Sequence, residues 1–289
     1  MNEKSFHTIK NDCFMFNQVS YKDANKVIAG LPMDYTVTFK PGSRFGPNKI
    51  REVSINLEDY SPYFDMNIYD ISYCDIGDLV LPMGNAKKSL DKIYDAALEV
   101  FKDNKVFVGL GGEHLVTLPI IKALNDVEDD FLLLHFDAHS DLRNEYEGEA
   151  LSHSTVIKRV AELIGNQNVY SFGIRSGTDK EFKWARENIN FYPFEVLANI
   201  KKIVDKIKGR KVYISVDLDV FDPAVFPGTG TPEAGGIFFN EFIEVIRILK
   251  KSHVKVLGMD LVELAPQFDM SDISAALSSK LLREMMVAF

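Results

Sequence analysis

Six side chains of the kinds that bind divalent metal ions lie in three short runs of this 289-residue sequence. They are four aspartates and two histidines: His114, Asp137, His139, Asp141, Asp217 and Asp219. Each run follows an apolar stretch of the length expected for a buried parallel strand, namely VFVGLGG, FLLLHF and KVYISV. Residues two apart in extended backbone point the same way, so the ligands of one run can converge. Three strand ends would therefore bring six ligands to one edge of a sheet, where open α/β folds bind their ligands.

The number and type of these ligands predict a metal-dependent hydrolase with two ions. A single aspartate at a strand end is more often a helix cap or a loop charge than a ligand. Four crowded carboxylates, however, would repel one another unless cations were present. Six protein ligands exceed the four of a structural zinc site, whereas two ions that share carboxylates account for them. An oxygen-rich set with two imidazoles favours Mn²⁺ over Zn²⁺.

The composition indicates a cytoplasmic globular protein. The chain is 46% hydrophobic and 26% charged, and it contains no repeat or linker, so we expect a single domain over residues 1–289. Two cysteines are too few for a disulfide framework. The first residues, MNEKSFHTIKND, do not form a signal peptide, and no segment is apolar enough to span a membrane. A formal net charge of -9 argues against a nucleic-acid surface.

Apolar periodicity predicts alternating strands and helices. The expected strands are Lys26 to Leu31, Val106 to Leu110, Phe131 to Phe136, Val169 to Ile174, Val212 to Val216 and Val254 to Met259. The expected helices are Pro47 to Leu57, Ala86 to Phe101, one ending near Leu124, one starting near His153, two around Glu181 and Ile203, Glu241 to Lys251, and one from Asp272. Such alternation predicts a mostly parallel sheet with helices on both faces.

Several motifs of the chain resemble the ureohydrolase family, the arginases and agmatinases. They are PGSRFGPNKIRE (41–52), GGEH (111–114), FDAHSDL (136–142), SVDLDVFDPAVFPGTGTPEAGG (215–236) and MDLVELAP (259–266), and the similarity runs from about Gly30 to Pro266. The resemblance implies an arginase-like three-layer α/β/α sandwich. It also implies a binuclear manganese centre and a reaction that cleaves a guanidino group to urea and an amine.

The same resemblance implies how the ligands divide between the ions. His114 and Asp141 would belong to one ion, and His139 and Asp219 to the other. Asp137 and Asp217 would bridge the two ions. A water between two ions loses a proton readily, and such a nucleophile is needed because the guanidinium carbon is a poor electrophile.

Three further roles follow from the family motifs. His153 would carry a proton from bulk to the leaving amine, with a pKa near physiological pH, although its position alone would favour a histidine that caps a helix into solvent. Glu263 would orient the planar guanidinium through paired hydrogen bonds, although most strand-end glutamates are surface charges. Asp141 would also bind the attacking hydroxide and relay its proton.

The loop from Leu142 to Ser152 should select the substrate. Glu145, Glu147 and Glu149 make it acidic, and no basic residue follows Arg143, so the loop favours an ammonium over a carboxylate. This pattern is most similar to agmatinases, although an ordinary solvated loop explains the glutamates equally well. Ser154, where many family members have glycine, leaves the shape of the pocket wall open.

Two other functions are compatible with these motifs. Within the fold, the chain could cleave another guanidine, such as arginine or 4-guanidinobutanoate. It could also be a non-catalytic metal-binding protein on this scaffold. Family members are commonly trimers or hexamers, so we expect a homo-oligomer. His7, His135 and His253 lack metal-like spacing, and we expect His135 to point away from the neighbours of Asp137 as a hydrogen-bonded core residue.

Overall fold

A nine-stranded sheet forms the centre of the computed structural model, which describes residues 6–9, 12–16 and 19–289. The strands lie in the order β1-β5-β2-β6-β11-β10-β7-β8-β9, and β1 is antiparallel to β5 whereas the others run parallel. Their bounds are β1 (Thr8–Ile9), β2 (Lys26–Leu31), β5 (Tyr73–Leu79), β6 (Val106–Gly111), β7 (Leu132–Phe136), β8 (Val169–Phe172), β9 (Asn190–Tyr192), β10 (Lys211–Asp217) and β11 (Lys255–Val262). A small hairpin of β3 (Tyr60–Ser61) and β4 (Met66–Asn67) lies apart from this sheet.

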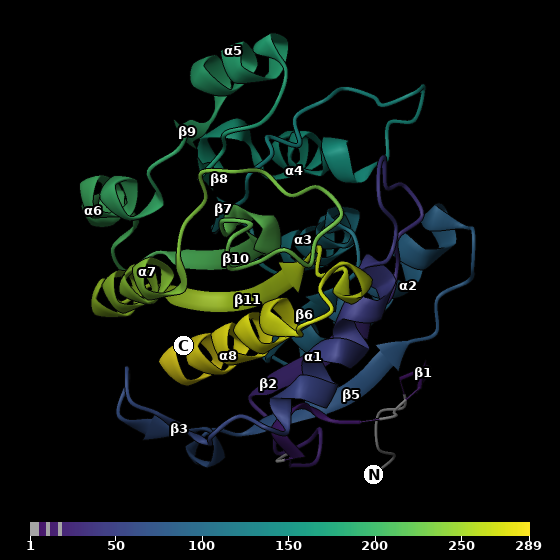
Figure 1. Cartoon of the computed structure of the whole chain (residues 1–289), viewed down its shortest axis with the longest axis vertical. Helices are drawn as coiled ribbons and strands as arrows, with labels where there is room; N and C mark the ends of the chain where they lie inside the picture. The colour runs from purple at the N-terminus through teal and green to yellow at the C-terminus, as the bar shows by residue number, and fades with distance from the viewer. Residues whose placement is uncertain (1–5, 10–11, 17–18) are drawn as a thin grey trace.

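Helices cover both faces of the sheet. One apolar cluster includes residues of α1 (Gly46–Ser54), α6 (Val196–Ile207), α7 (Phe239–Lys251) and α8 (Ile273–Ala288). The other includes residues of α2 (Ala86–Lys102), α3 (Thr117–Asn125), α4 (Val156–Ile164) and α5 (Asp179–Asn188). Figure 1 shows α1, α7 and α8 in front of the central strands and α2 and α3 behind them. The predicted three-layer α/β/α sandwich with a mostly parallel sheet is therefore confirmed.

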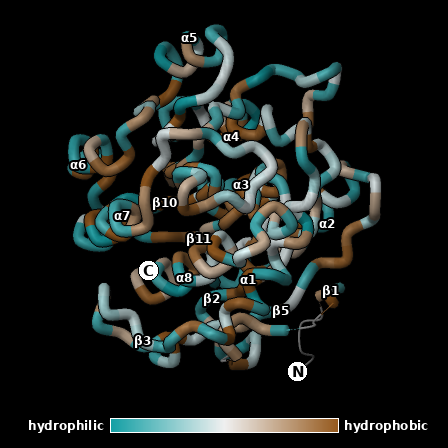
Figure 2. The backbone as a smooth tube through the Cα atoms, in the orientation of Figure 1, coloured by the Kyte–Doolittle hydropathy of each residue, from teal (hydrophilic) through white to brown (hydrophobic). Residues whose placement is uncertain are grey.

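The central strands are apolar because both of their faces are buried. In β7, Leu132, Leu134 and Phe136 pack in the first cluster and Leu133 packs in the second. Figure 2 shows the resulting hydrophobic interior, with hydrophilic stretches on the outer helices. Such double burial is typical of parallel strands covered by helices. Every helix among the described residues is too short or too polar to cross a bilayer.

Three strands of the sheet, β1, β5 and β9, were not predicted from the sequence, and β5 is the longest of them. β5 reads YCDIGDL, and its Asp75 and Asp78 interrupt the apolar pattern that predicts a strand. Arg51 of α1 binds both carboxylates, with Nε 2.8 Å from Asp75 Oδ2 and Nη1 2.5 Å from Asp78 Oδ1. Gly30 of β2 leaves the room that Asp78 needs, because a Cβ at this position would overlap its carboxylate. Tertiary ion pairing therefore stabilises a strand that local hydrophobicity does not indicate.

Candidate active site

The three predicted ligand runs lie together at the carboxyl edge of the sheet. Their strands, β6, β10 and β7, are close because only β11 separates β6 from β10. The turns that follow the strands differ from the extended backbone that we predicted. Asp137 Oδ1 accepts a hydrogen bond from the backbone N–H of His139 (2.5 Å), and Asp217 Oδ1 accepts one from Asp219 (2.9 Å). In each turn an aspartate side chain accepts from the backbone N–H two residues later, so the chain changes direction while the predicted ligands of that run stay close together.

His114 faces a buried group of carboxylates. Its Nδ1 lies 3.1 Å from Asp137 Oδ2, 3.2 Å from Asp141 Oδ2 and 3.3 Å from Asp217 Oδ2. His114 is 1% exposed, and none of these contacts has hydrogen-bond geometry at Nδ1. A buried imidazole nitrogen without a hydrogen bond and with three carboxylate oxygens around it fits a shared cation.

His139 forms the second part of the cluster. Its Nδ1 lies 2.9 Å from Asp219 Oδ2 and 3.7 Å from Asp137 Oδ1. Within the described residues, Asp137, His139 and Asp219 form one group with ligand atoms close enough to hold an ion. Asp137 also belongs to a second such group with His114 and His135. The residues present therefore fit two neighbouring cations with Asp137 between them.

The electrostatics of the carboxylates agree with this fit. Burial, Asp219 and Asp137 raise the pKa of Asp217 well above its ordinary value. Burial and the charge of Asp137 raise the pKa of Asp141 to about 7. Asp137 has the opposite shift, because the neighbouring imidazoles of His114, His135 and His139 outweigh its burial and hold its pKa well below the usual range. Protein groups alone thus leave two carboxylates poorly compensated, and divalent cations would supply the missing positive charge.

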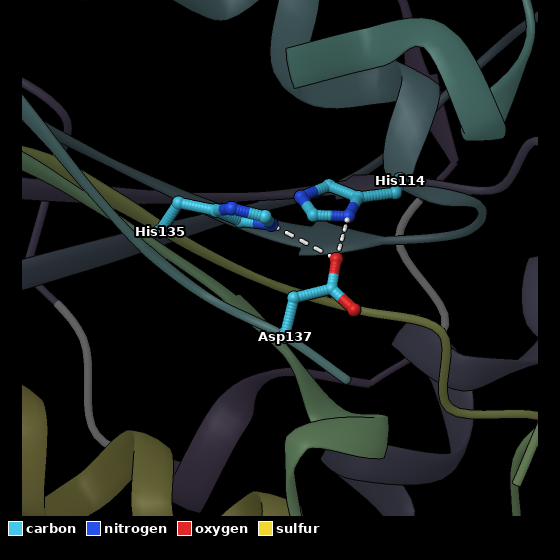
Figure 3. A group of neighbouring side chains, drawn as sticks. All are labelled: His114, His135 and Asp137. Atoms are coloured by element: carbon cyan, nitrogen blue, oxygen red, sulfur yellow. Dashed lines mark hydrogen bonds and ion pairs between the residues drawn. The ribbon is translucent and has the colours of Figure 1, made fainter. Parts of the chain in front are cut away.

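His135 requires a correction. It is fully buried and hydrogen-bonded, as expected, but its ring does not point away from the predicted metal ligands. We call these ligands the metal cluster: His114, Asp137, His139, Asp141, Asp217 and Asp219. Figure 3 shows His135 and His114 on either side of Asp137, with His135 Nε2 2.9 Å from Asp137 Oδ2. The reason is the two-residue period of β7 and its turn, which puts positions 135 and 137 on the same side of the sheet.

A cavity of about 350 Å³ opens beside the cluster. Residues at its wall include His139, Asp141, Asp217, Asp219, His153 and Glu263. Six of the candidate residues therefore border one space, although they come from four segments of the chain.

His153 lies at the start of the short 3₁₀ turn before α4. Its backbone N–H donates to Thr36 Oγ1 (3.0 Å), and its Nε2 lies 3.4 Å from Thr38 Oγ1. Burial lowers the pKa of His153 to about 4, which differs from the near-physiological value that we expected. The side chain lines the cavity and does not cap the turn into solvent. Because its pKa is about 4, the imidazole is neutral at neutral pH.

Glu263 follows β11 and is 7% exposed. The backbone N–H of His114 donates to its Oε1 (2.8 Å), which ties this carboxylate to the metal cluster. Burial and the nearby Glu113 raise its pKa well above the ordinary value. Glu263 and Asp141 both have positive φ, 65° and 52°, a conformation that costs backbone energy in non-glycine residues and occurs preferentially at functional sites.

Comparison with known proteins agrees with this geometry. The sequence model of the arginase family matches residues 24–288. The chain belongs to the arginase family. It is 50% identical to the agmatinase of Bacillus subtilis over 277 residues, which cover 96% of both chains. It is 35% identical to the N(1)-aminopropylagmatine ureohydrolase of Thermococcus kodakarensis over 286 residues, 96% of this chain and 94% of the other. The crystal structure of a putative agmatinase from Clostridium difficile matches with a TM-score of 0.91 at 40% identity, covering 93% and 98% of the chains.

Three predicted residues of this arginase-family chain do not reach the cavity. Glu145, Glu147 and Glu149 are exposed and lie outside its wall. Backbone hydrogen bonds of 2.9 Å in both directions between Tyr146 and Glu149 close a tight turn here. The loop is therefore not extended, so the spacing of the glutamates does not place them on one inward face.

Other residues that line the cavity were not predicted from the sequence. They include Thr38, Arg143, Tyr146, Thr178 and Glu181. Arg143 lies over the ring of Tyr146, 5.2 Å from its centroid, and its Nε is 3.9 Å from Glu181 Oε2. Arg143 is thus a basic residue at the cavity wall, paired with a carboxylate. The composition of the loop could have drawn attention to Arg143, but no local signal marks Glu181, which comes from α5.

Proposed function

We propose that this protein hydrolyses agmatine to urea and putrescine with two Mn²⁺ ions. The observation that carries the proposal is one cavity bordered by a cluster of carboxylates and imidazoles, His153 and Glu263, in a chain half identical to agmatinases along nearly its whole length. The arginase-family fold supports a ureohydrolase, and the identity to agmatinases supports this particular guanidine.

The metal site of this proposal uses six ligands. His114, Asp137, Asp141 and Asp217 would hold one ion, and His139, Asp137, Asp217 and Asp219 the other. The excess of carboxylate over imidazole favours Mn²⁺ or a similar oxygen-preferring ion. When bound, the ions would supply Lewis-acid chemistry that lowers the pKa of a water molecule in the site. The buried Nδ1 of His114, which has no hydrogen bond, supports this assignment.

Glu263 would hold the guanidinium. Its carboxylate borders the cavity and is oriented by the N–H of His114, so it can accept hydrogen bonds from the planar group. Because burial disfavours its ionised form, Glu263 gains from the arrival of a cation. Pairing would then keep the guanidinium carbon next to the carboxylates of the metal cluster, which is the positioning that the reaction requires.

Two residues would move protons in this scheme. Asp141 borders the cavity and can accept a proton from the attacking water. His153 can deliver a proton to the leaving amine, which departs only as a neutral molecule. Burial makes the imidazolium of His153 a strong acid, so it would hold a proton briefly during transfer.

The far wall of the cavity would receive the tail of agmatine. Glu181 lies there with Oε1 bound to Ser140 (2.7 Å) and Oε2 bound to Thr178 (2.7 Å). Arg143 and Glu181 compensate each other, so the wall offers no unpaired cation to a carboxylate tail. Glu145, Glu147 and Glu149 do not line the cavity and would act through their field on the association of a cationic substrate.

A substrate panel tests this function directly. We expect the highest kcat/KM for agmatine, with arginine and 4-guanidinobutanoate lower by about a thousandfold, because an unpaired buried charge costs several kcal/mol. N(1)-Aminopropylagmatine belongs in the panel, since a relative carries that activity in its name. A preference for arginine, or no urea from any guanidine with Mn²⁺ present, would contradict the proposal.

The proposal extends to the cellular location and the assembly of the protein. A cytoplasmic homo-oligomer, as a trimer or hexamer, is what the family resemblance implies. Light scattering during size-exclusion chromatography would measure the assembly, and a monomeric active enzyme would contradict it.

A further inference from the structure

Four buried polar side chains lie side by side across the centre of the sheet. They are Asp260 of β11, Ser215 of β10, His135 of β7 and Ser171 of β8, and the strand register pairs each with the next. Each is at most 1% exposed, and we call them the polar row. In β10 and β7 the row lies two residues before the carboxylate of the metal cluster. Burying polar groups in the middle of an apolar sheet costs free energy unless each finds a partner, so the partners indicate what the row does.

One end of the polar row supports His114. Asp260 Oδ2 accepts hydrogen bonds from the hydroxyls of Thr117 (2.9 Å) and Tyr213 (2.7 Å), and its Oδ1 lies 2.7 Å from Ser215 Oγ. Since a carboxylate only accepts hydrogen bonds, Ser215 donates its single hydroxyl proton to Asp260. Ser215 Oγ, 3.0 Å from His114 Nε2, must then accept the N–H of that nitrogen. In the neutral form of His114, which is the form that binds a metal ion, the other nitrogen, Nδ1, then carries no proton, and it is the one that faces the carboxylates of Asp137, Asp141 and Asp217.

The other half of the row supports Asp137. His135 Nε2 lies 2.9 Å from Asp137 Oδ2, and His135 Nδ1 lies 3.0 Å from Ser171 Oγ. The carboxylate accepts, so Nε2 carries the proton and Nδ1 accepts from the hydroxyl of Ser171. The hydrogen-bond partners of His135 therefore set which of its ring nitrogens carries the proton. Figure 3 shows that His135 and His114 approach the same carboxylate oxygen, so the row restrains both members of this contact.

We propose that the polar row orients His114 and Asp137 through hydrogen bonds and thereby sets the affinity for the ion that they share. This inference rests on the metal site of the proposed function. Partners behind a ligand select its tautomer and its orientation, and their loss commonly costs 10- to 100-fold in metal affinity. The row residues are positioning residues, because they touch ligands and not substrate.

Ser215→Ala is the main test. Titration of the metal-free full-length protein with Mn²⁺, followed by calorimetry and chelator competition, measures the affinity for each ion. We expect the ion at His114 to bind about 10- to 100-fold more weakly, and the ion at His139 to change by less than about threefold. Ser215→Thr keeps the hydroxyl and should restore most of the affinity.

Ser279→Ala is the matched control. Ser279 is equally buried, but its hydroxyl donates to the backbone oxygens of Ile50 in α1 and Ala275 in α8. It should lower the Tm without changing Mn²⁺ affinity. A row that served only the stability of the sheet would make Ser215→Ala behave in the same way, with lower Tm and unchanged affinity, and this result would overturn the inference.

Ser171→Ala provides a second, milder variant in case Ser215→Ala does not fold. It removes the partner of His135 Nδ1, and both ions should bind several-fold more weakly because Asp137 contacts His114 and His139. Wild-type affinity for both ions in Ser171→Ala would also overturn the inference. Wild-type protein that binds no Mn²⁺ would refute the metal site itself and the inference with it, whereas normal metal binding without agmatine hydrolysis would refute only the proposed substrate.

Discussion

Replacing Asp217 by asparagine should have opposite effects on the metal-free and the metal-loaded protein. Asp217 is 3% exposed and lies among Asp137, Asp141 and Asp219, so its charge is poorly compensated when no cation is bound. Asparagine keeps an oxygen that can accept from the N–H of Asp219, which now binds Asp217 Oδ1 at 2.9 Å. The metal-free variant should therefore be as stable as the wild type or more stable, with a Tm equal or a few degrees higher.

The metal-loaded variant should lose its stabilisation. Two unit charges 4 Å apart interact by about 4 kcal/mol at an effective dielectric constant of ~20, so losing one charge next to an ion costs at least about 3 kcal/mol, or roughly 100-fold in affinity. At a Mn²⁺ concentration of about 100 times the wild-type Kd, ligand binding stabilises the wild type by about 2.7 kcal/mol per ion. A 100-fold weaker site leaves about 0.4 kcal/mol.

Thermal unfolding with and without Mn²⁺, together with metal analysis and urea release, checks this prediction. We expect the Mn²⁺-dependent rise in Tm to shrink to a small fraction of the wild-type rise and the activity to fall by at least about 10³-fold. Asp222→Asn is the control, because Asp222 caps the same loop through the N–H groups of Ala224 and Gly235 without belonging to the cluster. A Mn²⁺-dependent Tm shift equal to that of the wild type in Asp217→Asn would refute the reasoning.

Further predictions address the metal, the proton path, the loop and the fold. Chelation should abolish urea release and lower the Tm, and Mn²⁺ should restore both; full activity after verified metal removal would contradict the metal site. His153→Asn should keep Mn²⁺ affinity but lower kcat roughly 100-fold or more, and an unchanged kcat would return His153 to a structural role. Replacing Glu145, Glu147 and Glu149 together by glutamine should reduce kcat/KM for agmatine by less than about tenfold, mainly at low salt, with kcat unchanged; equal loss for a neutral-tailed alkylguanidine would exclude a role in reading the ammonium. Arg51→Leu should destabilise the protein by roughly 3 kcal/mol or more in chemical denaturation, because it removes the guanidinium that binds Asp75 and Asp78, and a loss below about 1 kcal/mol would show that other contacts compensate these carboxylates.

The architecture was largely predictable from the sequence because it depends on local patterns. The predicted strand Lys26 to Leu31 has the same bounds as β2, and the predicted helix from Ala86 to Phe101 differs from α2 by one residue. Parallel strands buried on both faces are continuous apolar runs, and amphipathic helices repeat every 3.6 residues, so both leave a mark within a short window. The metal cluster was readable for a similar reason, since each ligand run directly follows its strand.

His135 shows a signal that was present but misread. It precedes Asp137 by two residues, and strand periodicity alone puts the two side chains on one side of the sheet. Its pairing with Ser171, in contrast, depends on the register between β7 and β8, which no single segment of the chain reveals.

Local patterns did not determine the features that depend on distant residues. β5 is a strand because Arg51, which precedes it in the chain by more than twenty residues, neutralises its aspartates. Glu181 reaches the cavity from α5, and Arg143 lies at the wall because Glu181 and Tyr146 hold it there. The acidic loop turns its glutamates outward because backbone hydrogen bonds close it.

The sequence by itself therefore determined the order of most elements and which carboxylates and imidazoles gather at one edge of the sheet, because those follow from hydrophobic periodicity and from residues next to strand ends. Only the tertiary structure decided which polar groups are buried together, which nitrogen of His114 faces the carboxylates and which side chains border the cavity. Burial, pKa and tautomer depend on the charges and hydrogen-bond partners that folding brings within a few ångströms, and those partners are far apart along the chain.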